Sequence, residues 1–367
     1  MPTTRQINQQ SVDILTGPRF LESYFAGIIH MPGKGVNEGF SEDTSAATVR
    51  VVRQSLPGFD PRRLGATANG GNFNNEDAGE PTSVEYDLLL TEMYDRNMDI
   101  AEVTTDMFSL PVVEQTMDNM AGEVNTAVNA STTAEQIKGW ANNAASKNGK
   151  AKSVALPANI TETSYRDAVL SAGAILDDGD EDVGVQTYPA DMRQIVARPT
   201  FCSKLLTAKN IVVGGDLSVA LLERGVISEG TYKGNGNLYV GEIDNTPVYK
   251  APSIIWNKAA EELVYSGTTA KSGNMKNTAT AKAEIDKIEA LVVSGVGTLR
   301  GIATGNRIKS IPSPRGAGIR LQPKFRWGVE CIYGTSIVPI VSNGFAIDSL
   351  VPEGKTLARL PVGSQTA

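Results

Sequence analysis

The distribution of hydrophobic and polar residues predicts two strands near the start of the chain. Residues 46–54 are rich in β-branched side chains, and their natural partner is the segment 83–96. Nearly every residue between these segments is a turn former, and such a long loop without periodicity usually has a function or is disordered. We therefore predict a projecting two-stranded hairpin rather than a core element.

Three helices are predicted in the next part of the chain. Residues 109–130 place apolar side chains at helical spacing, with Ser109 as the N-cap. A capping box at 132–135 predicts the start of a second helix. A third helix is expected to begin at Thr161 and to end at the acidic turn 177–182. The apolar stripe of the first helix consists of Val113, Met117, Met120, Val124 and Val128.

The second half of the chain has a mixed pattern. Residues 239–252 alternate on both sides of a turn at 244–246, which predicts a β-hairpin. Residues 278–295 return to helical character, and 307–341 are strand-rich with many Gly and Pro. No internal repeat is found. This order of elements predicts an α+β fold with more than one lobe.

The first segment of the chain, residues 1–44, is weakly patterned. Gly, Pro and polar residues dominate it, and no apolar face persists beyond the stretch 14–29. An arm that borrows its core from elsewhere would have this pattern, and so would a disordered tail. The pattern leaves both interpretations open.

Composition describes an ordinary globular chain. It has 367 residues, of which 41% are hydrophobic and 20% charged, and its net charge of -7 argues against broad attraction to nucleic acid. The N-terminus lacks the basic-then-apolar order of a signal peptide, and no apolar run approaches the ~20 residues that span a bilayer. We expect a soluble protein without membrane partners, made in a cytoplasm.

The two cysteines, Cys202 and Cys331, are far apart and match no zinc or redox spacing. Their apolar neighbours favour buried free thiols, which fits a reducing compartment.

Few residues suggest catalysis. His30 is the single histidine, and its glycine-rich surroundings make a catalytic role unexpected. The glycines of 294–301 resemble a phosphate-binding loop, but their spacing misses the dinucleotide-binding pattern by one residue and they follow a helical pattern. A flexible turn is favoured there, and a nucleotide-binding enzyme using 294–301 remains the alternative from another class. The acidic turn 177–182 lacks the glycine and glutamate of a calcium loop. We predict no catalytic residue, no cofactor and no metal.

Two groups of charges stand out. The segment 300–326 is basic and contains no acid, whereas the hairpin region 76–87 contains several acids. One-signed runs in strands repel themselves unless an opposite charge comes near. These runs are either solvated strand faces or surfaces that meet across a subunit boundary. The candidate contact residues are Arg62, Arg63, Glu76, Asp77, Glu80, Arg300, Arg307, Lys309, Arg315, Arg320, Lys324 and Arg326.

The layout as a whole resembles the major capsid proteins of tailed bacteriophages, the Hong Kong 97-like coat-protein fold shared with herpesvirus floor domains and encapsulins. A helix that ends near the acidic turn, followed by a strand reaching Arg198-Pro199, is similar to that family. The hairpin 239–252 resembles the hairpin of its axial domain, and 326–340 resembles its closing strands.

The resemblance implies a division of the chain into five parts. They are an N-terminal arm at 1–44, an extended two-stranded E-loop at 45–95, a first peripheral part with a spine helix at 96–175, an axial domain at 176–299 and a second peripheral part at 300–367. The arm and the E-loop are expected to reach over neighbouring subunits.

The resemblance also implies a function. The chain would be a structural subunit that self-assembles, as hexamers and pentamers, into an icosahedral virus shell around double-stranded DNA. Its partners would be a separate scaffolding protein, a portal and, optionally, a decoration protein; its location would be the virion, assembled in the host cytoplasm. An encapsulin-like compartment is the nearer alternative. Because no lysine lies between Lys34 and Lys138, we expect closure without covalent cross-links from the hairpin.

Overall fold

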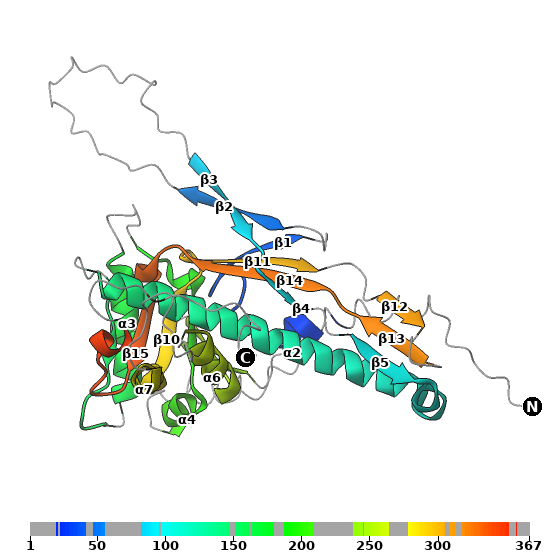
Figure 1. The fold of residues 1–367 in the computed structure, drawn as a ribbon. Helices are drawn as coiled ribbons and strands as arrows, with labels where there is room; N and C mark the ends of the chain where they lie inside the picture. The colour runs from blue at the N-terminus through cyan, green and yellow to red at the C-terminus, as the bar shows by residue number, and fades with distance from the viewer. Residues whose placement is uncertain are drawn as a thin grey trace, which may run out of the picture.

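The computed structural model shows a mixed α+β fold, as predicted (Figure 1). The residues that the structure describes are 20, 23–41, 47–55, 82–94, 97–146, 151–161, 163–179, 187–207, 238–244, 246–263, 278–304, 309–312, 318–351 and 357.

One long helix, α2 (Glu102–Ala144), organises the fold and runs beneath the sheets along most of the molecule (Figure 1). The predicted apolar stripe is buried where the structure describes it, since Met117, Met120, Val124 and Val128 are at most 1% exposed. Burial of each such side chain stabilises the fold by about 1.5–3 kcal/mol.

The predicted division into two helices at 132–135 is wrong, because α2 continues through it. Thr132 Oγ1 donates a hydrogen bond to the carbonyl of Val128, one turn earlier, instead of capping a new helix. Glu135 forms an ion pair with Lys138 and accepts a hydrogen bond from the Cys331 backbone. Both residues match the sequence pattern of a capping box, but their side chains form contacts within the helix and with other parts of the fold.

A four-stranded sheet lies over the middle of α2. Its order is β1 (Asn37–Ser41), β11 (Thr298–Thr304), β14 (Phe325–Cys331) and β4 (Glu92–Tyr94), with β1 parallel to β11 and the other pairs antiparallel. Ile302 and Trp327 point from this sheet into one apolar cluster with the α2 stripe.

A six-stranded sheet covers the other end of the molecule. Its order is β6 (Val154–Ala155), β15 (Ile337–Val341), β10 (Ile288–Ser294), β7 (Arg193–Ala197), β9 (Thr246–Lys250) and β8 (Tyr239–Ile243). Alternate residues of β10 and β15 enter two different apolar clusters, so both faces of the sheet are buried.

Helices cover both of these faces. One cluster contains residues of α3 (Ser164–Asp177) and α4 (Pro199–Thr207). The other contains residues of α6 (Ser253–Leu263), α7 (Thr278–Asp286), the short α8 (Ile347–Leu350) and the C-terminal part of α2. Two 3-10 turns, Ala190–Met192 and Gly334–Ser336, precede β7 and β15.

The domain boundaries at 175 and 300 remain a prediction, and strand pairing within both sheets crosses them. β15 was expected in the second peripheral part, but it pairs with β10 inside the six-stranded sheet. Conversely, β1 of the predicted arm belongs to the four-stranded sheet. Sheet pairing joins strands that are far apart in the sequence, so linear boundaries could not separate the two lobes.

The predicted projecting hairpin has a two-stranded base, in which β2 (Thr48–Ser55) pairs antiparallel with β3 (Thr82–Leu89). Its tip, between these strands, lies outside the described residues. A further three-stranded sheet, β12 (Lys309–Pro312), β13 (Gly318–Gln322) and β5 (Met98–Ala101), lies near the N-terminal end of α2 (Figure 1).

The other local predictions have mixed outcomes. The hairpin of β8 and β9 is confirmed, with Asp244 in its turn at a positive φ of 49°. The strand that leads to Arg198-Pro199 and the helix after it are confirmed as β7 and α4. The helix predicted over 278–295 is only half right, because α7 ends at Asp286 and β10 follows.

Candidate functional site

The base of the hairpin lies against the four-stranded sheet, on the face opposite α2 (Figure 1). Three glycines form a row across this face, because Gly39 of β1 pairs with Gly301 of β11, which pairs with Gly328 of β14. Positions without a Cβ leave a shallow channel in which another backbone can approach closely. We call these three residues the glycine row.

Each glycine of the row faces the hairpin or the residues just after it. A Cβ on Gly39 would lie 2.7 Å from a methyl group of Val49, and one on Gly301 would crowd leucine side chains at 3.0 Å. A Cβ on Gly328 would overlap the carbonyl oxygen of Leu89, which is backbone and cannot rotate away. The close seat of the hairpin therefore depends on glycine at these positions.

The two faces of the hairpin base differ in character. Val51 and Leu88 form a buried cluster with Leu299 beneath the hairpin. On the opposite face, Arg50 and Asp87 form an exposed ion pair at 3.2 Å, with side chains that are 59% and 62% exposed. The hairpin is thus fixed on one side of its base and turns charged groups outward on the other.

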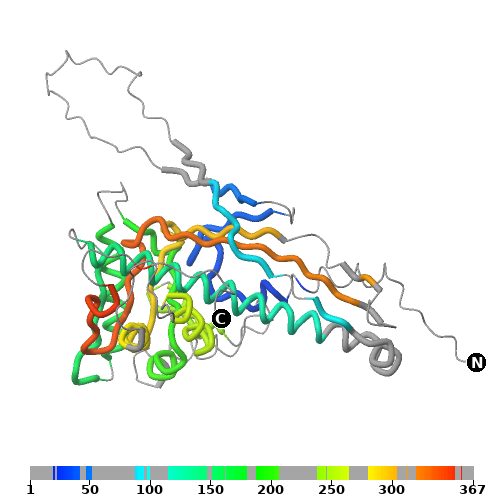
Figure 2. Tube along the Cα trace, in the orientation of Figure 1, coloured from blue at the N-terminus to red at the C-terminus, as the bar shows by residue number. Residues whose placement is uncertain are grey.

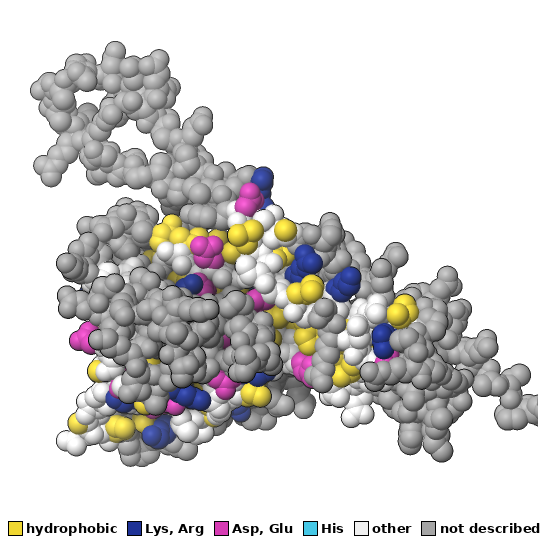
Figure 3. Space-filling view, in the orientation of Figure 1, with side chains coloured by type: hydrophobic (Ala, Val, Ile, Leu, Met, Phe, Trp, Pro, Cys, Tyr) yellow, Lys and Arg dark blue, Asp and Glu magenta, His cyan; other side chains and the backbone are white. Residues whose placement is uncertain are grey.

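Apart from Arg300, the predicted contact residues fall into three groups. Arg62, Arg63, Glu76, Asp77, Glu80, Arg307, Arg315 and the side chain of Lys309 lie outside the described residues. Arg320 forms an ion pair with Asp99 of β5 through two hydrogen bonds of 2.6 and 2.8 Å, so its partner belongs to the same subunit. Lys324 is exposed, and Arg326 lies on the hairpin side of β14 with its Nε 3.4 Å from Met93 Sδ. Lysine or arginine and hydrophobic side chains lie next to each other on this face (Figure 3).

The prediction of an inter-subunit contact for Arg300 is wrong, because its side chain is completely buried. Its Nε donates to Glu38 Oε1 at 2.9 Å, and its Nη2 donates to the carbonyl of His30 at 2.9 Å. Burial lowers the pKa of Arg300, but Glu38 and Tyr24 raise it, and the net direction is upward. The guanidinium therefore remains charged in the interior and joins β11 to the N-terminal segment.

That N-terminal segment, residues 23–36, crosses α2 before it enters β1 (blue in Figure 2), and we call it the strap. One face of α2 carries a ladder of polar side chains that bind it. Asn125 donates to the Ser23 carbonyl, Asn129 donates to the Gly27 carbonyl, and Gln136 donates to the Gly35 carbonyl, at 3.0–3.2 Å. Asp118 accepts the Ser23 hydroxyl, and Thr133 contacts the His30 ring.

The strap corrects the expectation for the arm. Phe20, Tyr24 and Ile28 enter the apolar cluster of α2, so this part of the arm borrows its core from its own subunit. Residues 1–19 lie outside the described part of the chain. The sequence prediction did not include the ladder, because it rested on the apolar stripe of the helix. Polar residues at 125, 129, 133 and 136 repeat at helical spacing, which is the signal that could have revealed it.

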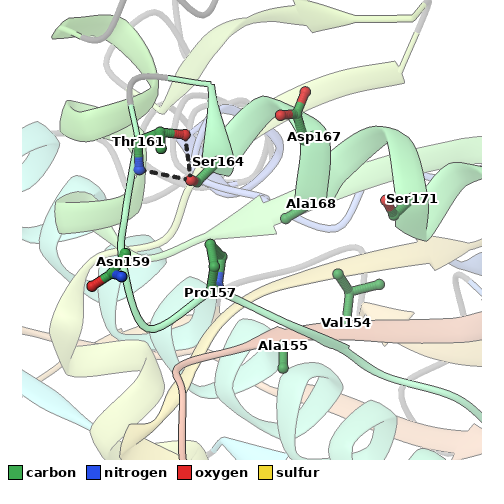
Figure 4. Close-up of a pocket in the computed structure, with 9 residues that line it drawn as sticks. All are labelled: Val154, Ala155, Pro157, Asn159, Thr161, Ser164, Asp167, Ala168 and Ser171. Carbon is green, nitrogen blue, oxygen red and sulfur yellow. Dashed lines mark hydrogen bonds between the residues drawn. The ribbon is translucent and has the colours of Figure 1, made fainter.

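A surface groove of about 370 Å³ lies between the edge strand β6 and the first half of α3 (Figure 4). Its lining includes Asp167, Thr161 and Ser164, and the Ser164 hydroxyl lies 2.9 Å from the Thr161 hydroxyl. Among the described lining residues there is no histidine, lysine or cysteine that could activate these hydroxyls.

The glycines of the phosphate-loop alternative serve internal packing. Gly295 and Gly297 lie in the turn that connects β10 with β11, so a strand precedes them and not the expected helix. A Cβ on Gly295 would lie 3.1 Å from the carbonyl oxygen of Lys34, and one on Gly297 would overlap Ser336. Neighbouring parts of the subunit therefore pack directly against the side-chain positions of both glycines.

The other features considered are metal binding, membrane insertion and the two thiols. Within the described residues, no three metal-binding side chains come together, and no described helix is long and apolar enough to span a membrane. Both cysteines are free, and burial raises the pKa of Cys202 to about 11 and that of Cys331 to about 12. Such thiols are poor nucleophiles at neutral pH.

Comparison with known proteins gives only structural matches. No family model and no curated protein matches the sequence. The head structure of Helicobacter pylori bacteriophage KHP40 has a TM-score of 0.49 and 9% identity, covering 88% of this chain and 90% of that chain. The mature capsid of bacteriophage PhiM1 has a TM-score of 0.46 and 12% identity, covering 87% and 89%. A virus-like particle from Pyrococcus furiosus has a TM-score of 0.40 and 7% identity, covering 89% and 98%.

Proposed function

We propose that this chain is the structural subunit of an icosahedral virus shell that encloses double-stranded DNA. Subunits would assemble as hexamers and pentamers, with a separate scaffolding protein and a portal as partners and the virion as their final location. Assembly in the host cytoplasm and an optional decoration protein belong to the same proposal.

The observation that carries this proposal is the hairpin β2–β3. Its base is fixed by the glycine row, and its strands project from the body (Figure 1). A two-stranded ribbon is marginally stable alone in water, and its edges offer unpaired backbone groups to another chain. A ribbon held rigidly at one end is suited to reach a neighbouring subunit.

The receiving surface would be the uncovered part of the four-stranded sheet. Lys324, just before β14, is exposed, and Arg326 of β14 lies beside Met93, which is 47% exposed. We expect the tip acids Glu76, Asp77 and Glu80 of one subunit to meet these bases on the next, while Arg62 and Arg63 also contact the neighbour. Arg307, Lys309 and Arg315 would face such acids or DNA phosphates.

The decisive experiment removes the hairpin tip, residues 57–81. By circular dichroism the variant, which is lighter than the 39.0 kDa full chain, should remain folded, yet it should form no shells by light scattering and negative-stain microscopy. A variant with a Gly/Ser loop of the same length is the matched control, because it keeps the reach of the hairpin but lacks its charges. Normal particles from the deletion variant would contradict the proposal.

Purified wild-type particles separate this proposal from its alternatives. Nuclease-protected DNA inside them supports a virus shell, whereas protein cargo without DNA supports an encapsulin-like compartment. A stable monomer that binds nucleotide stoichiometrically would support the enzyme.

The same particles test how the shell is closed. Boiled, denatured particles should run as one band near 39.0 kDa, because we propose non-covalent closure. High salt should loosen them, since charges are screened beyond about 10 Å at 0.1 M ionic strength. A ladder of covalent multimers would contradict this part of the proposal.

A further inference from the structure

Three consecutive residues of the strap, Ile29, His30 and Met31, connect three separate parts of the fold, and we call them the clasp. From β7 of the six-stranded sheet, Gln194 donates to the Ile29 carbonyl at 3.1 Å and accepts from the Met31 amide at 2.8 Å. From β11 of the four-stranded sheet, Arg300 donates to the His30 carbonyl at 2.9 Å.

The third part is α2, which binds the clasp through two side chains. Asn129 Oδ1 accepts a hydrogen bond from the Ile29 amide at 3.1 Å, and Thr133 Oγ1 lies 2.9 Å from His30 Nε2. His30 and both α2 side chains are at most 1% exposed. The clasp is therefore the place where both sheets and the long helix are tied to one short stretch of backbone.

The contacts of His30 define its protonation state. Thr133 Oγ1 donates its single proton to the carbonyl of Asn129 at 2.9 Å. It must therefore accept a hydrogen bond from His30, so the neutral ring carries its proton on Nε2. His30 Nδ1 is buried and has no hydrogen-bond partner among the described residues. A second proton on the ring would therefore be an unpaired buried donor.

The charges around His30 also oppose a second proton. The α2 face beside it presents the neutral groups of Asn129, Thr133 and Gln136, and β7 presents the neutral Gln194. From β11 comes the buried cation of Arg300, whose partner Glu38 on β1 is already bound to it. The strap itself adds Tyr24, which burial keeps un-ionised by raising its pKa.

We propose that the clasp is an acid-sensitive lock within the subunit: neutral His30 holds the strap against α2 and both sheets, and protonation of His30 releases the strap. This inference concerns one subunit and does not depend on the assembly proposed above. Release would loosen the connection between the four-stranded and six-stranded sheets, because the clasp residues bind side chains from both.

The direction of the pH effect follows from the environment of His30. Burial and then Arg300 lower its pKa from 6.5 to about 3. The released strap takes up a proton below about pH 6.5, whereas the closed clasp does so only near pH 3. Between these values, acid favours the released form by about tenfold per pH unit, and the closed form is fully favoured only above about pH 6.5.

The test uses amide hydrogen exchange on the free subunit at pH 7.5 and pH 5, corrected for the intrinsic pH dependence of exchange. Protection of the amides in 28–36 should fall about 30-fold more than in a His30→Gln variant, in which a neutral amide replaces the ring. Gln194→Ala is the matched control, because it should weaken protection at both pH values and keep the wild-type ratio between them. Equal ratios in wild type and His30→Gln would overturn the proposal.

A second measurement keeps the proposal falsifiable if the His30→Gln subunit does not fold. His30 is the only histidine of the chain, so its ring signals in an NMR spectrum need no assignment. In the folded wild-type subunit these signals should stay at the neutral position from pH 8 to pH 5. A titration midpoint near 6.5 in the folded state would overturn the proposal.

Discussion

The strap and the hairpin are neighbours in the sequence, yet opposite principles hold them. The strap is fixed by directional hydrogen bonds from buried polar side chains, such as those of Asn129 and Arg300. The hairpin base is held by close packing. The glycine row has no side chains, so the hairpin backbone lies close to the sheet, and apolar residues pack beside it. Hydrogen bonds along its length hold the strap within its own subunit. The hairpin is packed against the sheet only at its base, which suits the proposed contact with a neighbouring subunit.

This comparison predicts that the largest loss follows from breaking the buried ion pair. Arg300→Leu leaves the Glu38 carboxylate and the His30 carbonyl without their partner in the interior. Removing one partner of a buried pair typically costs about 3–5 kcal/mol, and urea unfolding of the free subunit would measure it.

Two further variants make that test specific. Arg300→Met combined with Glu38→Leu should recover part of the stability, because no unpaired charge remains. Arg320→Leu, which breaks the more exposed pair with Asp99, should cost clearly less. If Arg300→Leu and Arg320→Leu lowered the free energy of unfolding equally, burial would not explain the contribution of the Arg300–Glu38 pair to stability.

The next effect concerns the ladder. Asn129→Ala leaves the Gly27 carbonyl and the Ile29 amide without their side-chain partner, and each unpaired buried group costs about 1–3 kcal/mol. Thermal unfolding would show the loss, and hydrogen exchange would locate it in the strap.

Asn142 offers a matched control on the same helix. Its side chain also binds one carbonyl and one amide, both of Leu357 near the C-terminus. Asn142→Ala should therefore leave exchange in the strap unchanged, and faster strap exchange in that variant would contradict a local role for the ladder.

A smaller loss of stability is expected at the glycine row. In Gly328→Ala the new methyl group meets the Leu89 carbonyl, and overpacking of this kind costs about 1–3 kcal/mol. Because the strain falls on the hairpin seat, shell formation should suffer more than folding, as particle yield per folded subunit would show. Gly122→Ala is the control: nothing lies within 4 Å of that position on α2, so a gain of up to about 1 kcal/mol is expected.

These sites also show which parts of the molecule could be predicted from its sequence. The strands of the hairpin base and the hairpin of β8 and β9 could be predicted, because alternation and turn residues are local signals. The glycine row could not, because Gly301 and Gly328 meet only through strand pairing. From the sequence, a glycine needed for a turn looks the same as a glycine over which another strand packs closely. Likewise, a polar residue that caps a helix looks the same as a polar residue inside one.

The charged residues illustrate the same difference. Arg300 and Lys324 belong to one basic run in the sequence, yet the first is buried in an ion pair and the second is exposed. Charge patterning counts residues along the chain, whereas burial depends on which face of β11 a side chain occupies. The run of basic residues therefore identified a segment with unusual charge. It could not show which of these residues form ion pairs within the subunit and which are exposed and available for contacts.

The smallest effect is expected at the exposed ion pair of the hairpin. Arg50 and Asp87 have the same kind of contact as Arg300 and Glu38, but their charges stay in water. A double-mutant cycle with Arg50→Ala and Asp87→Ala should give a coupling of about 0.2–1 kcal/mol in the free subunit, falling as salt is added. Assembly measured with the same four proteins sharpens the comparison, because a pair that points toward a neighbour can affect shells without affecting the subunit. A coupling in the free subunit as large as that of Arg300 and Glu38 would show that exposure does not distinguish the hairpin from the strap.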